Sequence, residues 1–478
     1  MILTLLFLGS IQTHAQNNLS FYYLGDYVQQ TTSVSPVYIP KNSFSLGLPV
    51  LSGIYASVSS DLPSNLILTP DPNDPEKNDI NLQNIIDLTT GDLLNIKLNQ
   101  SFSLLHLSFK RKNGSLSFFA NEIIDANIGF SKNGIFNLLN GGSTQVGNQL
   151  LFNDKVNITA YSEAGFGFTQ QFLDKKLAIG LRAKYILGIL NGSTFDDGEI
   201  SIDIEDDFTW RVNTRNAGFR VAGLQFDEDY TFSSDHKGFG FDIGATYEVI
   251  PNLTLELAIN DLGSITWKNS TTTYRLKDVT DVRIEGVDLT SDGDLAEEFV
   301  DQLEAAADGE ENKGESYTTT LNTNSYVSAL YKLKNIHHFK LTMFNQHQNS
   351  DNQSVIALGY NLALKKSTYG LVGIKDEVGE ISMGLNFAAT LGGLQIYATS
   401  DNLFTGLTKL ESPELLTNIN ARIGINFVFG YKKWILKKAK EEEEFDEEEI
   451  EVEIIQQEVE EVVEDEVGQT DQNLQSIE

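Results

Sequence analysis

The clearest pattern in this chain is an alternation of apolar and polar side chains with a period of two. It is nearly complete in the segment 418–430. One face carries Ile419, Ala421, Ile423, Ile425, Phe427 and Phe429, and the other carries Asn420, Arg422, Gly424, Asn426 and Gly430. Such a strand suits hydrocarbon on one side and water on the other, as the wall of a transmembrane β-barrel requires. The pattern predicts a membrane-spanning strand.

Similar segments recur along the chain and predict an all-β protein, a single antiparallel transmembrane barrel over residues 43–431. Fourteen segments have the length and alternation of such strands: 43–60, 100–111, 115–128, 154–170, 176–190, 238–249, 253–262, 323–333, 337–347, 353–365, 369–376, 379–390, 394–402 and 418–430. Outer-membrane barrels commonly have an even number of strands of about ten residues each.

The connections between these segments alternate in length. Short turns rich in Gly, Asn, Asp or Lys fall at 112–114, 173–175, 251–252, 334–335, 366–367 and 391–393, whereas long connections occupy 61–99, 129–153, 191–237 and 263–322. Short turns are typical of the periplasmic end of a barrel and long loops of the outer end. Residues 1–15 read as a signal peptide cleaved after Ala15, although no basic residue precedes the apolar run. We expect an outer-membrane protein with its C-terminal tail in the periplasm.

Several segments lie outside the predicted wall. For residues 16–42 two interpretations remain open, a plug in the barrel mouth or a simple lead-in to the first strand. Within the long connections, 194–212 and 272–289 are predicted to extend strands above the membrane, and 294–307 to be helical. Residues 432–478 form a basic collar followed by an acidic tail, which we expect to be disordered because blocks of like charge stay solvated.

Composition narrows the classes of function. The net charge is −33, and residues 441–466 alone hold sixteen Asp or Glu and no Lys or Arg. Nucleic-acid binding needs clustered positive charge, so no nucleic-acid partner is expected. Cysteine is absent, which excludes thiol catalysis and disulfides. The expected partners are outer-membrane lipid and, through the tail, periplasmic or secretion-system proteins.

Candidate enzymatic or metal chemistry is sparse. The pair His337 and His338 points to opposite faces of a strand, so it cannot chelate one ion by itself. A lipase would need a base such as His106 beside a serine and an orienting group, and no local pattern supports that arrangement. Acidic loops at 71–74 and 291–294 lack the spacing of a calcium loop. We therefore predict no catalytic residue, no cofactor and no metal.

Charged residues on the polar faces of the strands are the predicted lining of the lumen: Glu163, Arg182, Lys184, Asp242, Glu248, Glu256, Lys340, Asp401 and Arg422. In an open pore these charges would set ion selectivity. In an occluded barrel they would pair across the lumen and hold it rigid. Because both signs are present, we favour the occluded barrel.

Two motifs indicate a family resemblance. The segment 394–404 contains Ser-Asp-Asn-Leu at 400–403, and 420–430 contains Arg422, Gly424, Asn426 and Gly430 in an R-x-G-x-N-x-x-x-G arrangement. With the Ser-Pro-Val at 35–37, these elements resemble an uncharacterised Bacteroidetes family of outer-membrane barrels. More distantly the layout is similar to FadL-type transporters and to the PorV and PorP/SprF barrels. The resemblance implies an outer-membrane barrel and no defined substrate.

Two functions remain open from the sequence. The first is a non-enzymatic structural or secretion-associated component of the envelope, whose acidic periplasmic tail binds a partner. The second is a passive transporter or pore for small hydrophobic molecules.

Overall fold

The computed structural model describes residues 18–62, 68–71, 74–88, 91–136, 146–207, 209–223, 235–284, 308–348, 351–376, 381–403 and 418–430. The predicted signal peptide, the predicted helix at 294–307, residue 431 and the predicted collar and tail at 432–478 lie outside the described residues.

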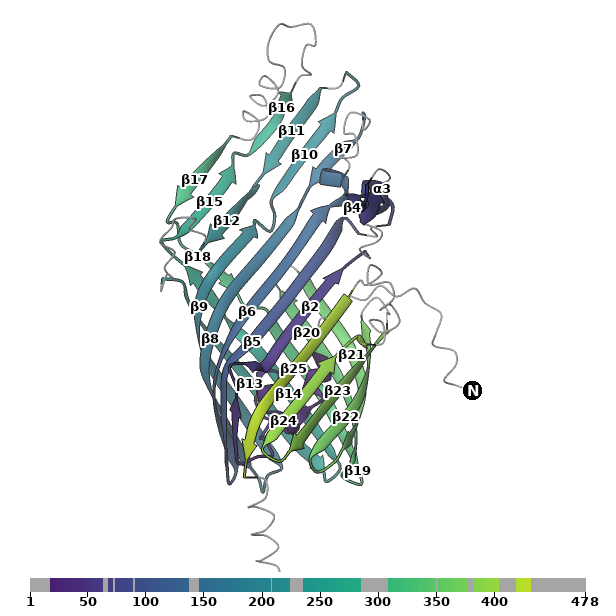
Figure 1. Ribbon diagram of the computed structural model, residues 1–478. Coiled ribbons are helices and arrows are strands. Elements are labelled where there is room, and N and C mark those ends of the chain that lie inside the picture. Colours follow the sequence, from purple (N-terminus) through teal and green to yellow (C-terminus); the bar gives the residue numbers. More distant parts are fainter. Residues whose placement is uncertain are drawn as a thin grey trace, which may run out of the picture. The chain divides into compact units, whose positions relative to one another are not determined.

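Fourteen antiparallel strands close into a barrel (Figure 1). They are β2 (Val50–Ser60), β5 (Leu93–Arg111), β6 (Gly114–Ser131), β8 (Lys155–Phe172), β9 (Leu177–Thr194), β13 (Lys237–Ile250), β14 (Leu253–Trp267), β19 (Thr323–Leu333), β20 (His337–Gln348), β21 (Asp351–Ala363), β22 (Ser367–Asp376), β23 (Ile381–Leu391), β24 (Leu394–Ser400) and β25 (Asn418–Phe429). Each pairs with the next, and β25 pairs with β2, for example Ile423 with Ile54. The predicted fold and all fourteen strands are confirmed.

The first predicted strand, 43–60, is not continuous. It is broken into β1 (Phe44–Gly47) and β2, and both parts pair with β5. Pro49 has no N–H to donate, Val50 has a left-handed φ of 62°, and the register to β5 shifts between Val50 and Ile54. Proline and a bulge thus interrupt the wall at residues 48–53, which the alternation pattern alone did not reveal.

Some strands are longer than predicted. β5 begins at Leu93 rather than at residue 100, and its added part contains Asn95, Lys97 and Asn99. This part alternates like the rest of the strand, with Leu94, Ile96 and Leu98 between the polar residues, and the prediction wrongly placed it in the connection 61–99. β6, β9 and β14 also extend past their predicted ends.

Shorter strands lie in the long connections. β12 (Gly218–Ala222), β15 (Thr271–Leu276), β17 (Gly309–Lys313) and β18 (Tyr317–Thr320) continue the barrel sheet. A second sheet has the order β16 (Val279–Ile284), β11 (Trp210–Arg215), β10 (Glu199–Ile204) and β7 (Gln149–Phe152), and β3 (Leu68–Asp71) pairs with β4 (Asp74–Ile80). The predicted extensions within 194–212 and 272–289 are confirmed where residues are described. Short helices are α3 (Leu82–Leu88) and η3 (Lys132–Phe136).

The outward face of the barrel is apolar. In β13, Phe239, Phe241 and Ile243 are exposed, Phe239 by 60%, while Gly240 and Asp242 between them are buried. β25 follows the predicted faces, with Ile423 exposed and Asn426 buried. A continuous apolar surface of this kind is stable against hydrocarbon rather than water, so the barrel is of the outer-membrane type. Among the described residues, no helix is long and apolar enough to cross a membrane.

The N-terminal residues 18–42, here called the lumen segment, lie against the inward face of the barrel (Figure 1, purple). They form α1 (Leu19–Tyr22), η1 (Gly25–Tyr27) and η2 (Gln29–Ser33). Phe21 and Tyr22 are fully buried in a cluster that includes Tyr326, Phe344 and Tyr397 of the wall.

Candidate functional site in the barrel lumen

The two sequence motifs, at 400–403 after β24 and at 422–430 in β25, contact the beginning and the middle of the lumen segment. Asp401, which follows β24, accepts a hydrogen bond of 2.6 Å from the backbone N–H of Ser20. Arg422 of β25 donates to Asn18 at 3.2 Å and lies 4.4 Å from the centre of the Phe21 ring. The residues on which the family resemblance depends therefore contact the lumen segment directly.

Asn426 of β25 forms a reciprocal amide pair with Gln30 of η2. Gln30 Nε2 donates to Asn426 Oδ1 at 2.6 Å, and Asn426 Nδ2 donates back to Gln30 Oε1 at 3.0 Å. Asn426 also donates to Gln395 at 3.1 Å, and Gln395 donates to the carbonyl of Tyr27 at 2.5 Å. An amide has two donor positions and one acceptor oxygen, so this network uses nearly its full capacity.

A buried charged pair holds the C-terminal part of the segment from the other side of the barrel. Lys340 of β20 lies 3.2 Å from Glu256 of β14, and Glu256 accepts a 2.6 Å hydrogen bond from Ser35. The Lys340 ammonium also donates to the Tyr38 hydroxyl at 2.8 Å. Because a buried charge is costly without partners, these contacts stabilise the pair and the segment together.

Several backbone carbonyls of the lumen segment accept hydrogen bonds from the wall. Thr169 donates to Pro36 at 2.7 Å, Asn260 to Val34 at 2.8 Å and Arg182 to Thr32 at 3.3 Å. An irregular segment leaves its carbonyls without regular partners, and buried carbonyls need acceptor contacts of this kind. The wall thus supplies the hydrogen bonds that secondary structure would otherwise provide.

Glycines in the wall make room for the segment. A Cβ at Gly180 of β9 would lie 2.1 Å from the Pro36 carbonyl oxygen, and one at Gly359 of β21 would lie 2.0 Å from the Tyr23 ring. Both distances are far below van der Waals contact. A side chain at either position is therefore incompatible with the present seat of the segment.

Tyr22 joins the lumen segment to the wall by one neutral hydrogen bond and by ring stacking. Burial raises the pKa of Tyr22 well above its usual range, and the Glu256 carboxylate raises it further, so the hydroxyl stays neutral. It lies 2.8 Å from the Ser328 hydroxyl, and the Tyr22 ring stacks on Tyr326 at 4.6 Å.

We expect Tyr22→Phe to lower the free energy of unfolding by about 1 kcal/mol, because one buried hydrogen bond is lost while the stacking remains. Denaturant titration of the protein refolded in lipid vesicles measures it. Tyr369→Phe, on the exposed outer face of β22, is the matched control and should leave the free energy unchanged. A Tyr22→Phe value equal to the control would mean that this hydroxyl does not stabilise the segment.

The remaining charged residues of the predicted lumen lining form a cluster on adjacent strands. Lys184 of β9 lies 2.8 Å from Asp242 of β13 and 3.8 Å from Glu163 of β8, and it also pairs with Asp261 of β14. Arg182 lies 2.8 Å from Asp242, its direct partner across β9 and β13. The pairs therefore run along the wall, between neighbouring strands or, for Lys184 and Asp261, across the one strand β13 that separates them, rather than across the lumen.

The structure places the nine predicted lining residues as follows. Glu163, Arg182, Lys184, Asp242, Glu256, Lys340 and Asp401 are buried, while Arg422 and Glu248 are half-buried. Glu248 lies near the short turn after β13, apart from the others. Sequence reasoning missed Asp261, because its inward position depends on a left-handed φ of 64° and a register shift in β14, neither of which leaves a pattern in the sequence.

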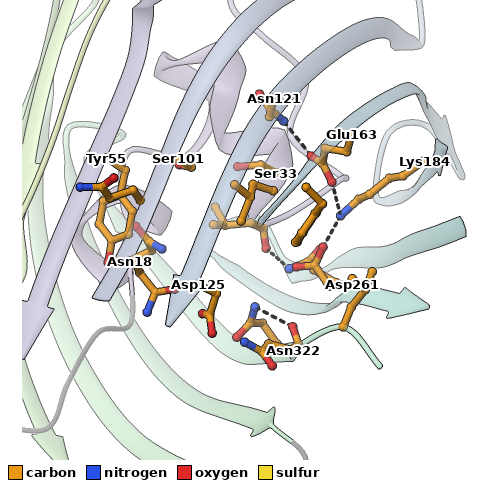
Figure 2. A pocket seen from close by; sticks show the side chains of 18 of the residues that line it. Asn18, Ser33, Tyr55, Ser101, Asn121, Asp125, Glu163, Lys184, Asp261 and Asn322 are labelled. Carbon is orange, nitrogen blue, oxygen red and sulfur yellow. Dashed lines mark hydrogen bonds and ion pairs between the residues drawn. The ribbon is translucent and has the colours of Figure 1, made fainter. Parts of the chain in front are cut away.

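Beside η2 lies a polar cavity of about 190 Å³, here called the chamber. Its lining is rich in amides, hydroxyls and carboxylates: Asn18, Gln30, Ser33, Tyr55, Ser101, Asn121, Asp125, Glu163, Lys184, Asp261 and Asn322 are among the residues that surround it. Figure 2 shows Glu163, Lys184 and Asp261 converging at one side. The chamber therefore suits a polar occupant.

His106 also lines the chamber, on the inward face of β5. It is buried, and its Nε2 lies 3.4 Å from Thr32 of the lumen segment. No hydrogen bond joins it to Ser101, Ser103 or Ser108 within the described part of the chain. In the same part, no three His, Asp or Glu side chains are grouped to hold a metal ion.

Residues 36–401 match the model of a family of unknown function, DUF5723. The chain belongs to this family. The match begins inside the lumen segment and ends at Asp401, so it spans most of the barrel together with part of the segment that lies in it. Among curated proteins, no significant match was found.

Three solved structures have some likeness to this DUF5723 barrel. A TodX monoaromatic hydrocarbon channel mutant is 10% identical, with 84% of this chain and 94% of that one covered and a TM-score of 0.42. The Ralstonia pickettii toluene transporter TbuX is 10% identical over 81% and 89% of the chains (TM-score 0.36), and a Pseudomonas aeruginosa FadL homologue is 9% identical over 85% and 98% (TM-score 0.40).

Proposed function

We propose that this protein is a non-enzymatic outer-membrane barrel whose lumen segment closes a passage for small molecules and opens it by moving. The observation that carries the proposal is the reciprocal amide pair between Gln30 and Asn426, together with the three wall donors to backbone carbonyls of the segment. Contacts of this kind hold a segment in one position without a covalent or wholly apolar attachment.

The segment has two chemically different parts. Residues 19–28 are mostly apolar and pack into the aromatic cluster of the wall, whereas η2 is polar along its whole length, with the sequence Gln-Gln-Thr-Thr-Ser. Each hydrogen bond of η2 can be exchanged for one to water at a net cost of roughly 0.5–1.5 kcal/mol. We therefore place the moving part at η2, and the anchor at the apolar residues before it.

The chamber next to η2 indicates the class of solute. Its amide, hydroxyl and paired charged side chains can replace the hydration of a polar molecule, although Ile265, Leu321 and Phe344 also line it. We infer that small polar solutes pass through the lumen.

Conductance in planar bilayers tests this function. The intact protein should be silent, and a chain lacking residues 18–42 should give discrete conductance steps. A chain lacking residues 441–478 is the control and should stay silent. Conductance of the intact protein equal to that of the first deletion would show that the lumen segment does not close the passage.

A passage for small hydrophobic molecules is the second candidate. The observation that favours it is the break between β1 and β2 with its register shift after Val50, where the apolar side chains of Val50 and Leu51 are exposed. An apolar molecule would leave the lumen where this break locally opens the hydrogen-bonded wall. The test is uptake of a fluorescent hydrocarbon into vesicles that contain the protein. Uptake by a protein whose lumen does not conduct ions would favour this route.

The acidic tail supports a further role as a partner-binding arm in the periplasm. Its charge would attract a basic partner, and salt would weaken the attraction. We expect protease added to intact cells to cut within 191–237 or 263–322 and to spare the residues after Lys440. Cleavage of the tail from outside would contradict the predicted orientation.

Deletion of residues 441–478 is expected to remove one specific periplasmic or inner-membrane protein from the set recovered by crosslinking, while the barrel still assembles. An unchanged set of partners would refute the tail as a binding arm and leave the passage as the remaining function.

A further inference from the structure

A second pocket, of about 470 Å³, lies at the end of the barrel with the long connections. Lys155 of β8, Arg220 of β12 and Arg275 of β15 contribute to its lining, so it is called here the arginine pocket. In a chain of net charge −33, three cationic side chains around one pocket are a departure from the general composition.

Arg220 and Arg275 lack carboxylate partners among the described residues. Arg220 forms no hydrogen bond or ion pair there, and Arg275 donates only to the amide oxygen of Asn216. Basic residues nearby behave differently: Arg211, Arg215, Lys277 and Lys313 each pair with a carboxylate. The two arginines of the pocket thus keep N–H donors that the described protein does not use.

An aromatic ring holds both guanidinium groups in place. The guanidinium carbons of Arg220 and Arg275 each lie 4.4 Å from the centre of the buried Phe195 ring, and Arg220 also lies 5.4 Å from Tyr317. Stacking on a ring engages the face of a guanidinium and leaves its in-plane N–H groups free for an acceptor. This arrangement positions donors before any ligand binds.

No carboxylate among the described residues around the pocket forms an ion pair with Arg220 or Arg275. Asp196 and Asp197 belong to the lining, and Asp197 accepts a hydrogen bond from Asn216. Glu310 of β17 is the register partner of Arg275, and no ion pair joins them. Lys155 donates to the backbone carbonyls of Phe195 and Asp196, which fixes the loop that carries Phe195.

The arginine pocket and the chamber share part of their lining. Asn157, Thr319 and Thr320 contribute to both. A solute bound in the pocket would therefore already lie beside the chamber, on the inner side of the wall rather than against lipid.

We propose that the arginine pocket binds the anionic group, a carboxylate or a phosphate, of a small soluble molecule that then enters the chamber. This inference rests on the proposed passage for its role in transport, but binding itself does not require the passage to open. Arg220 and Arg275 supply charge-assisted hydrogen bonds, and the Phe195 ring positions their guanidinium groups.

Calorimetric titration of the intact protein with inorganic phosphate, and separately with succinate, tests the site. Arg220→Gln and Arg275→Gln should each weaken binding roughly tenfold or more, because each removes a charge-assisted contact. Arg283→Gln is the matched control, since Arg283 is exposed on β16 and lies outside the pocket lining. Equal binding by all four proteins, or none by the wild type, would overturn the proposal.

Two further measurements separate the alternatives. The same titration in nanodiscs with and without phosphate-bearing lipopolysaccharide distinguishes a soluble anion from a lipid phosphate: competition by the lipid would overturn the assignment to a soluble molecule. If no variant of the barrel conducts, the proposed passage fails. Loss of phosphate binding in the arginine variants would still establish the site in that case.

Discussion

Gly180→Val is expected to turn a silent barrel into one that conducts ions in planar bilayers. Any Cβ at this position would lie 2.1 Å from the Pro36 carbonyl oxygen and 2.7 Å from the Val37 nitrogen, so the backbone of the lumen segment has to move. That movement removes the 2.7 Å hydrogen bond from Thr169 to Pro36. The wall itself accepts the change, because valine suits a β-strand.

Gly192→Val is the control for this experiment. Gly192 belongs to the same strand, β9, and a Cβ there meets no atom within 4 Å. Valine at 192 should therefore leave the barrel silent, and both variants should fold and insert equally well. If Gly180→Val assembles and remains silent, the segment does not block the passage by its position in the lumen.

Ile425→Arg should lower the free energy of unfolding by about 2–4 kcal/mol or prevent assembly, since a charged side chain near the middle of the lipid face is costly. Ile425 lies on the outward face of β25 with 36% of its surface exposed in the barrel. Refolding into lipid vesicles followed by denaturant titration measures the effect, and Ile425→Leu should be close to neutral.

Asn426→Arg is expected to affect ion conductance rather than assembly. Its side chain faces the lumen, where it pairs with Gln30 and Gln395. The variant should insert nearly as well as wild type, yet it should leak ions because the amide pair with η2 is lost. Equal loss of assembly in the Ile425→Arg and Asn426→Arg variants would show that these two neighbouring residues do not face lipid and lumen respectively.

The wall could be predicted because its physical requirement is local. A membrane strand must present an apolar residue at every second position, and this requirement is visible in the sequence as an alternating pattern, for example from Ile419 to Phe429. The break at Pro49 was not foreseen, because a bulge obeys no simple period. The beginning of β5 was assigned to a connection, although Leu94, Ile96 and Leu98 alternate with polar residues there.

The candidate site was foreseen only in part. The polar faces of the strands identified residues such as Lys184 and Glu256 as candidates for the lumen, since a strand that faces lipid on one side must turn its charges inward. Their partners were not predictable. Asp261 reaches Lys184 through a bulge, and Ser35 reaches Glu256 across 221 residues of chain, so neither contact has a sequence signal.

The sequence by itself therefore determined the barrel, the number of its strands and, for strands such as β25, the side that faces lipid, because those properties follow from neighbouring residues and one solvent boundary. Only the tertiary structure decided what lies inside. Residues 18–42 are polar and apolar in no regular order, and their burial depends on glycines and amides brought together from strands hundreds of residues apart, such as Gly180 and Asn426. Hydrogen bonds of this kind form only when the closed wall sets their geometry.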